Sequence, residues 1–269
     1  MNNEMLYVFG TGNASVTNLY NTCFALRDKD EYLMVDAGGG NGILKILKNM
    51  NVPIEKIHHL FVTHEHTDHI LGVVWMVRMI ATKMLKGQYE GDAYIYCHDA
   101  LADTIDTLCR LTVQGKHYKM IGDRIHLERL QDGDTRRILS YDVTFFDIHS
   151  TKAKQFGFSL RLNNGKKLTC LGDEPYNPLC ADYVKESDWL LSEAFCLYRE
   201  RDKWKPYEKH HTTVKEACEL AEELNVPNLV LWHTEDSNVA EREHLYKEEG
   251  KQYYHGNLYV PADETLITL

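Results

Sequence analysis

The sequence predicts an α/β fold in which β-sheets are covered by amphipathic helices. Two observations lead to this prediction. Short apolar strands bounded by turns alternate with segments whose apolar residues recur at helical spacing, and their order is not a regular strand–helix repeat. The chain has 269 residues, enough for one substantial core, and it contains no internal repeat or low-complexity linker. We therefore expect a single domain over residues 1–269.

The first half of the chain begins with strands and continues with helices. Alternating or continuous apolar residues predict strands at 5–9, 23–26, 32–35, 59–62 and 93–97. Apolar residues at helical spacing predict a helix that carries Ile43, Leu44, Ile46 and Leu47, and further helices at 69–85 and 100–111. Gly-x-Gly at 10–12 and the glycines at 38–40 lack the remaining spacing of a nucleotide-binding loop, so we interpret them as tight turns.

The second half adds strands at 142–148, 156–162, 167–171, 189–191 and 229–232. A helix is expected at 214–224, where Thr213 and Glu216 have the spacing of a capping box. Another helix is expected at 238–249.

Composition narrows the class of protein. The formal net charge of −10 argues against a protein whose main task is gripping a polyanion. The most apolar stretch ends at Arg78, well short of the roughly 20 residues that cross a bilayer, and residues 1–4 do not resemble a secretory signal. The seven cysteines are scattered without a Cys-x-x-Cys pair. This pattern favours reduced thiols and a cytoplasmic location, with no membrane partner.

One short segment, residues 63–69, carries the chemistry. It reads Thr-His-Glu-His-Thr-Asp-His and directly follows an apolar strand. Alternation along the strand lets His64 and His66 point the same way, while Asp68 and His69 enter the next helix and face a second nearby point. Imidazole and carboxylate groups are the ligands that suit zinc and similar divalent ions.

The pattern His-x-His-x-Asp-His resembles the signature of the metallo-β-lactamase superfamily. Three later positions fit the remaining pattern of that family: His149 after a strand, Asp173 after a strand and a glycine, and His233 at the end of a late strand. The resemblance implies a four-layer αββα sandwich, with two mixed β-sheets and helices on the outer faces. It also implies two divalent metal ions, with Zn²⁺ favoured and Mn²⁺ or Fe²⁺ as alternatives.

The resemblance also assigns the ligands. One metal is expected on His64, His66 and His149, and the other on Asp68, His69 and His233, with Asp173 bridging them. Asp68 is expected to orient the attacking water and take its proton. Di-iron redox relatives carry glutamate at the position of His66, so the histidine here favours hydrolysis.

Within the superfamily the chain is similar to the ribonuclease Z branch. The similarity rests on five runs: Phe9–Ala14, Asn21–Phe24, Val35–Gly38, Ser192–Phe195 and His211–Val214. It implies that His211 aids the leaving group or binds the scissile phosphate, with Glu193 supporting it. The sequence leaves open whether His210 or His211 faces the site.

The sequence departs from the ribonuclease Z pattern in a segment that bears on the substrate. Long-form ribonuclease Z carries a tRNA-clamping arm between the third histidine and the bridging aspartate, whereas residues 150–172 hold only two strands and a tight turn. A phosphodiester is therefore expected, with RNA less favoured than a smaller molecule. Basic residues that could form a phosphate-binding rim are Lys152, Lys154, Arg199, Arg201, Lys203 and Lys205, and tyrosines that could stack on a base are Tyr176, Tyr198 and Tyr207.

Two alternatives stay open. The same metal-activated water would hydrolyse a small carboxylic ester, thioester or lactone, and an inherited fold could serve a non-catalytic binding protein. A homodimer is the oligomeric state that the resemblance suggests.

Overall fold

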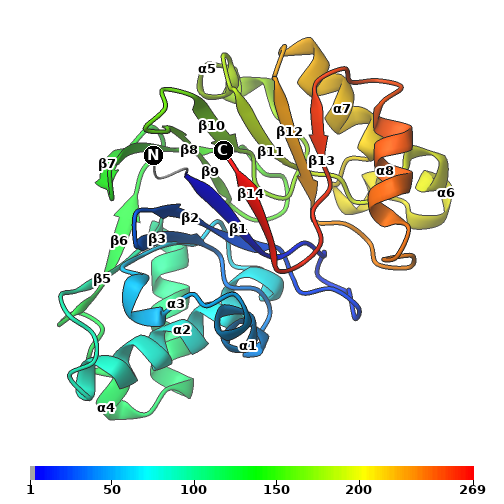
Figure 1. Cartoon of the computed structure of the whole chain (residues 1–269). Coiled ribbons are helices and arrows are strands. Elements are labelled where there is room, and N and C mark those ends of the chain that lie inside the picture. Colours follow the sequence, from blue (N-terminus) through cyan, green and yellow to red (C-terminus); the bar gives the residue numbers. More distant parts are fainter. Residues whose placement is uncertain (1–3) are drawn as a thin grey trace. The chain divides into compact units, whose positions relative to one another are not determined.

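The computed structural model describes residues 4–269, so the sequence start on which the secretory-signal argument rests lies largely outside it. The chain divides into two compact units. Unit 1 comprises residues 1–10, 20–131 and 264–269, and unit 2 comprises residues 11–19 and 132–263. Each unit contains one seven-stranded sheet (Figure 1). The expectation of a single domain stays a prediction.

The sheet of unit 1 has the order β14-β1-β2-β3-β4-β5-β6. Its strands from β14 to β3 pair antiparallel, and those from β3 to β6 pair parallel. The parallel half matters for the site, because parallel strands end together at one edge of a sheet. The bounds are Met5–Gly10 (β1), Cys23–Asp28 (β2), Glu31–Val35 (β3), His59–Phe61 (β4), Ala93–His98 (β5), Ile125–Leu130 (β6) and Thr265–Thr268 (β14).

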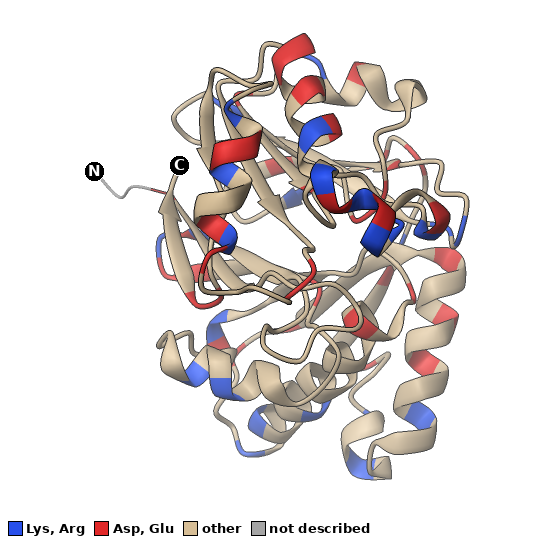
Figure 2. Cartoon of the chain, turned by 90° about the vertical axis from the view of Figure 1, so that its right-hand side faces the viewer, with Lys and Arg blue, Asp and Glu red and all other residues tan. Residues whose placement is uncertain are grey.

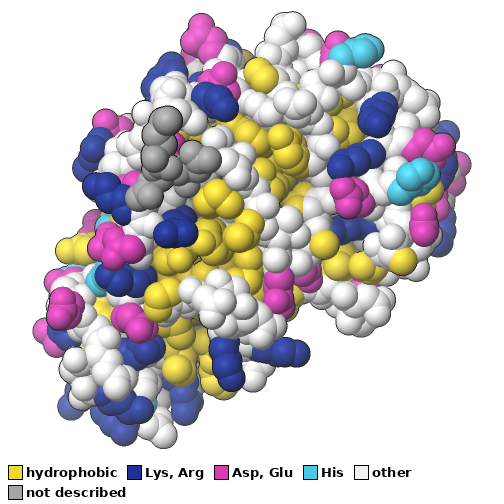
Figure 3. All heavy atoms as spheres, in the orientation of Figure 1, with side chains coloured by type: hydrophobic (Ala, Val, Ile, Leu, Met, Phe, Trp, Pro, Cys, Tyr) yellow, Lys and Arg dark blue, Asp and Glu magenta, His cyan; other side chains and the backbone are white. Residues whose placement is uncertain are grey.

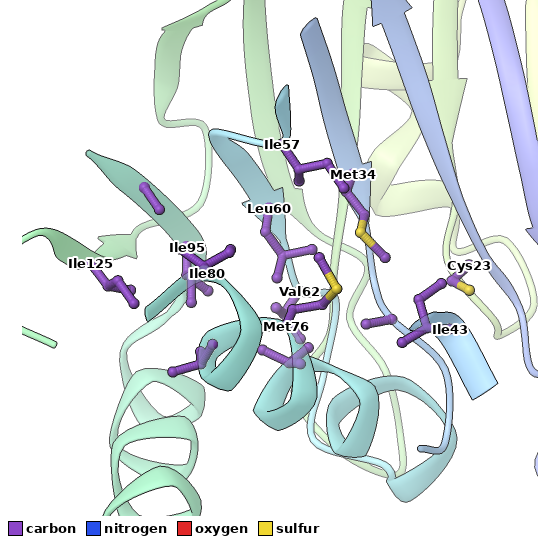
Figure 4. Packing of buried hydrophobic residues seen from close by; sticks show 14 of the residues in the cluster. Cys23, Met34, Ile43, Ile57, Leu60, Val62, Met76, Ile80, Ile95 and Ile125 are labelled. Atoms are coloured by element: carbon purple, nitrogen blue, oxygen red, sulfur yellow. The ribbon is translucent and has the colours of Figure 1, made fainter. Parts of the chain in front are cut away.

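Helices cover one face of this sheet. The long helix α2 packs on the parallel strands, where Met76 and Ile80 meet Leu60 and Ile95 in a buried cluster (Figure 4). These four side chains are almost fully buried, so they contribute the apolar burial that holds the helix against the sheet. The helices of unit 1 are Gly42–Asn49 (α1), Thr67–Leu85 (α2), Asp99–Thr112 (α3) and Gly115–Tyr118 (α4).

The sheet of unit 2 has the order β13-β12-β11-β10-β9-β8-β7. It repeats the plan of the first sheet, since β7 to β10 pair antiparallel and β10 to β13 pair parallel. The bounds are Thr135–Ile138 (β7), Tyr141–Asp147 (β8), Phe156–Arg161 (β9), Lys167–Cys170 (β10), Trp189–Glu193 (β11), Asn228–Trp232 (β12) and Asn257–Tyr259 (β13).

Helices α7 and α8 lie beside the parallel strands of this second sheet (Figure 1). Thr213 and Glu216 form the predicted capping box at the start of α7, which confirms that prediction. Val214, Ala217 and Ala221 of α7 belong to the buried cluster of the unit. The helices of unit 2 are Ala181–Val184 (α5), Arg201–Trp204 (α6), Val214–Glu223 (α7) and Arg242–Gly250 (α8).

The predicted strands and helices are confirmed with shifts of a few residues at their ends. The four-residue helices α4, α5 and α6 were not predicted, and two further differences stand out. Helix α8 begins at Arg242 rather than at residue 238, because residues 238–241 form turns. Four strands were not predicted: β6 and β7 carry charged residues, and β13 and β14 have only three and four residues. No helix among residues 4–269 is long and apolar enough to span a bilayer.

Candidate metal centre

In unit 1 the predicted ligands lie at the carboxyl end of the parallel strands. Strand β4 ends at Phe61, and the segment that follows it carries His64 and His66 before α2 begins at Thr67. Asp68 and His69 occupy the first turn of α2 and are buried. The sequence prediction that these residues lie on one short loop and helix start is confirmed.

The rings of His64 and His66 converge on each other. His64 Nε2 lies 2.8 Å from His66 Nδ1, and Thr63 Oγ1 lies 2.9 Å from His64 Nδ1. The Thr63 contact on Nδ1 leaves Nε2 as the nitrogen that His64 directs toward His66. Two imidazole nitrogens brought together in this way form a donor set that suits a divalent metal ion.

Asp36 orients the third imidazole of this segment, a role that the sequence analysis did not assign. Asp36 Oδ2 lies 2.7 Å from His69 Nδ1, and the Asp36 carboxylate also accepts hydrogen bonds from Thr63 N and Oγ1, each at 2.8 Å. His69 Nε2 then lies 3.3 Å from Asp68 Oδ2. A carboxylate on the far nitrogen of a ligating histidine fixes its tautomer and raises its basicity.

Close packing brings Asp36 to His69. A Cβ on Gly72 of α2 would lie 1.8 Å from the carbonyl oxygen of Ala37, so only glycine lets the helix approach the loop after β3. At this contact Gly72 N donates to Gly38 O at 2.7 Å. The run Val35–Gly38 supported the family resemblance, but a single sequence does not show that its aspartate touches a histidine 33 positions later.

In unit 2 the three predicted ligands follow three different strands. His149 follows β8, Asp173 follows β10, and His233 directly follows β12. His149 and His233 have φ angles of 58° and 56°, in the left-handed region that non-glycine residues rarely adopt. His233 Nε2 lies 3.4 Å from Asp173 Oδ2, and Gln155 Nε2 donates to Asp173 Oδ1 at 2.6 Å.

Glu193 and His211 form a buried pair beside His233. His211 Nδ1 lies 3.4 Å from Glu193 Oε2, the ring of His211 stacks on Phe195 at 5.0 Å, and its centroid is 5.2 Å from that of His233. Burial disfavours the charged form of His211, but the adjacent carboxylate of Glu193 outweighs it, so the pKa of His211 is raised. The ligand atoms of Glu193, His211 and His233 lie within 4.8 Å of one another.

The two adjacent histidines differ in their surroundings, although both line the pocket described below. His210 is exposed, has a φ of 59°, and places Nδ1 2.7 Å from Thr151 Oγ1. His211 is buried and makes the contacts with Glu193 and His233.

A pocket of about 360 Å³ opens beside these histidines within unit 2. Two of the three tyrosines proposed as stacking residues, Tyr176 and Tyr207, contribute to its wall. Tyr198 does not, because Arg201 and Lys215 lie over its ring at 4.1 and 4.4 Å. The lining residues are His149, Thr151, Glu174, Pro175, Tyr176, Asn177, Pro178, Tyr207, His210 and His211.

Sequence comparison decides the family. The family described as "Anti-Pycsar protein Apyc1" matches residues 5–253. The chain belongs to this family. The motifs that resemble ribonuclease Z do not distinguish it from the Apyc1 family. The family match is therefore more specific than the resemblance drawn from the motifs.

The curated relatives that match this chain are ribonuclease Z proteins. Ribonuclease Z of Nitrosopumilus maritimus is 23% identical over 89% of this chain and 92% of its own length. Ribonuclease Z of Thermococcus sibiricus is 24% identical over 99% of this chain and 96% of its own length. The resemblance stated from the motifs is therefore confirmed.

Solved structures confirm the predicted fold class. The metallo-β-lactamase fold protein YhfI from Bacillus subtilis has a TM-score of 0.79 at 19% identity, covering 99% of both chains. The short form of human tRNase Z has a TM-score of 0.75 at 21% identity, covering 98% of both chains. A diphosphatase of the PhnP family has a TM-score of 0.73 at 13% identity, covering 99% of this chain and 97% of that one.

The basic residues proposed for a phosphate-binding rim do not form one continuous positive patch in this Apyc1-family chain. Lys154 lies over Phe156 and Lys203 over Trp204, while Lys205 pairs with Glu208 at 3.0 Å. Figure 2 shows basic and acidic residues interspersed along the helices, and Figure 3 shows the same mixture on the face that it presents. Of the proposed rim, Lys152 lies nearest the site, with its Nζ 3.6 Å from Glu174 Oε1.

The cysteines play no part in the candidate site. All seven are buried, and no disulfide links them among residues 4–269, as the scattered spacing predicted. Burial raises the pKa of Cys97, Cys109, Cys196 and Cys218 to about 12, so these thiols stay protonated at neutral pH.

Proposed function

We propose that this protein is a metal-dependent phosphodiesterase that uses two divalent ions to cleave a small phosphodiester. The observation that carries the proposal is the buried pair of Glu193 and His211 beside His233. A histidine whose pKa is raised by a carboxylate is suited to protonating the oxygen that leaves when a phosphodiester breaks. The ribonuclease Z relatives support the same chemistry.

The donor residues fit two metal ions. The proposed ligands are all histidines and aspartates, and five of the seven are at most 4% exposed. Buried groups of this kind are stable only when they are paired or bound to a cation. In this proposal His64, His66 and His149 would hold one ion, Asp68, His69 and His233 would hold the other, and Asp173 would serve both. Bound there, the ions would lower the pKa of a water and polarise the phosphoryl group.

The protein's own side chains have distinct roles in this proposal. Asp36 and Thr63 hold the histidine rings of unit 1 in one tautomer. Asp68 accepts the proton of the attacking water. His211 donates a proton to the leaving oxygen, and Glu193 keeps His211 protonated until that step.

A small substrate is favoured over precursor tRNA for three reasons. The pocket of about 360 Å³ has the size of a small-molecule site, for which about 300–1,000 Å³ is typical. The interval between β8 and β10 contains one further strand and a tight turn, with no arm. The net charge is −10, and the basic residues are interspersed with acidic ones. Zn²⁺ is the metal we favour, with Mn²⁺ or Fe²⁺ as alternatives.

The test is a substrate panel with the protein loaded with Zn²⁺ or Mn²⁺. It contains bis(p-nitrophenyl) phosphate, a 3′-extended precursor tRNA, p-nitrophenyl acetate and a simple lactone. Chelated protein and the Asp68→Ala variant serve as controls. We expect chelator-sensitive turnover of the small phosphodiester, no cut at the acceptor stem of the tRNA, and no turnover by the variant.

Each other result has a defined meaning. A cut at the base of the acceptor stem would replace the small substrate by tRNA. Turnover restricted to the ester or lactone would overturn the phosphodiester assignment and support the carbonyl hydrolase. Bound metal without turnover of any substrate would support a non-catalytic protein. The homodimer and the cytoplasmic location stay predictions.

A further inference from the structure

Arg242 is a buried cation that the proposed chemistry does not use. It is the first residue of α8 and is only 5% exposed. Its guanidinium donates to Thr234 Oγ1 at 2.8 Å, to Thr11 Oγ1 at 2.9 Å and to the carbonyl oxygen of Pro261. Thr11 Oγ1 in turn donates to Asp263 Oδ1 at 2.7 Å. These three acceptors help to offset the cost of burying the charge.

The residue that Arg242 holds is the one after His233. The backbone of Thr234 is fixed as well, because Thr234 N donates to Thr11 O at 3.0 Å and Thr234 O accepts from Asn13 N at 3.0 Å. Thr234 and Thr11 are both fully buried. Arg242 therefore joins the loop after β12 to the turn at 11–13 and to the chain near Pro261.

This anchorage stands next to a strained backbone. His233 adopts a φ of 56°, which a non-glycine residue keeps only when its surroundings fix it. On the other side of the same loop, Glu235 N donates to Phe195 O at 2.8 Å. Thr234 is thus the position through which a side chain can control the conformation of His233.

We infer that Arg242 is a positioning residue that holds Thr234, and through it His233, in the conformation that His233 needs to bind metal. The inference rests on the proposed function, in which His233 is a metal ligand. Arg242 touches neither metal nor substrate and acts only through the loop. Groups that orient a ligand from behind typically change metal affinity about 10–100-fold when they are removed.

The experiment compares Arg242→Gln and Thr234→Val with the control Tyr254→Phe. The control removes another buried hydrogen bond of unit 2, from Tyr254 Oη to Val226 O at 2.7 Å, without touching the loop. Zn²⁺ affinity is measured by competition with a chelator, and the metal content of each chain is counted. We expect about a tenfold or greater loss for one of the two ions in Arg242→Gln, a smaller loss in Thr234→Val, and none in the control.

A second readout uses the metal-free chain. The imidazole NMR signals of His233 should shift in Arg242→Gln and Thr234→Val but not in Tyr254→Phe. Unchanged affinity and unchanged His233 signals in both variants would overturn the inference. If Arg242→Gln does not fold, Thr234→Val gives the decision alone. A wild-type chain that binds no metal would count against the proposed function, while the NMR comparison would still decide the role of Arg242.

Discussion

The proposed ligands of unit 1 and those of unit 2 are positioned in different ways. In unit 1 four of them lie within residues 64–69, and one carboxylate, Asp36, orients this segment from behind. In unit 2 they are His149, Asp173 and His233, which follow three separate strands and are supported by different neighbours. The first set is specified by local sequence. The second set comes together only when strands β8, β10 and β12 are correctly placed in their sheet, and two of its members adopt left-handed backbone conformations.

The comparison teaches where strain is located. The histidines at 64, 66 and 69 do not adopt positive φ angles, whereas His149 and His233 do. In unit 2 the residue after each strained histidine is anchored by a charged side chain: Ser150 Oγ donates to Glu174 at 2.6 Å, and Thr234 accepts from Arg242 at 2.8 Å. One carboxylate, Asp36, therefore supports the contiguous segment of unit 1, whereas each strained histidine of unit 2 has a separate anchor beside it.

The largest effect should come from removing a ligand in either unit. We expect Asp68→Ala and Asp173→Ala each to lower kcat on the order of 10³-fold, because the proton acceptor or the bridge between the metals is lost. Steady-state kinetics with Zn²⁺-loaded protein, together with metal analysis, measures the effect. Chelated wild-type protein should be equally inactive. Retained activity in only one of the two variants would show that the proposed ligands of that unit are not required for turnover.

The next prediction tests Asp36, the carboxylate that contacts His69 in unit 1. Asp36→Asn should weaken metal binding about 10–100-fold, since it replaces the charged partner of His69 Nδ1. Asparagine tolerates the φ of 55° at this position, so the backbone should be unaffected. The control is Asp92→Asn, which removes a surface carboxylate 3.0 Å from His126 in the same unit. Equal affinities in the two variants would contradict the assigned role of Asp36.

A smaller effect concerns the titration of His211 in unit 2. Glu193 raises the pKa of His211, so Glu193→Gln should lower that pKa, and His211 should lose its proton at a lower pH than in the wild type. NMR titration of the metal-free chain measures the shift directly. Glu249→Gln is the matched control, because Glu249 is also buried, at 7% exposed against 1% for Glu193, but accepts from Tyr198 N at 2.7 Å instead. An unchanged His211 pKa would remove Glu193 from the proposed mechanism.

The smallest effect sharpens the contrast in strain. In the metal-free chain, His233→Gly and His69→Gly both remove a buried imidazole and should both lower the free energy of unfolding. His69→Gly should lower it by about 1 kcal/mol or more beyond His233→Gly, because glycine relieves the left-handed backbone at 233 but is unfavourable in the first turn of α2. Urea unfolding of both variants measures the difference. Equal losses would mean that backbone strain does not distinguish the two sets.

Sequence reasoning reached most of the site because the ligand pattern is made of residue types that few other functions place together. It named Asp36 only as part of a motif, and it did not mention Gln155, Glu174 or Arg242. Their importance comes from contacts between distant positions, such as Arg242 with Thr11, which periodicity cannot show. Strands β6 and β7 escaped prediction because charged residues such as Glu128, Arg136 and Arg137 occupy them, so pairing with neighbours rather than hydrophobic pattern defines them.

The turn between β9 and β10 has a consequence for how such proteins acquire new substrates. Residues 163–165 are exposed, Gly165 has a φ of 86°, and Leu162 N donates to Lys166 O at 2.8 Å to close the hairpin. Loop-closure entropy grows slowly, with each doubling of a loop adding about 0.6 kcal/mol. An arm could therefore be inserted or lost at this turn while the hairpin below it keeps its register. Evolution, or a protein engineer, could change the size of the substrate here without rebuilding the metal centre.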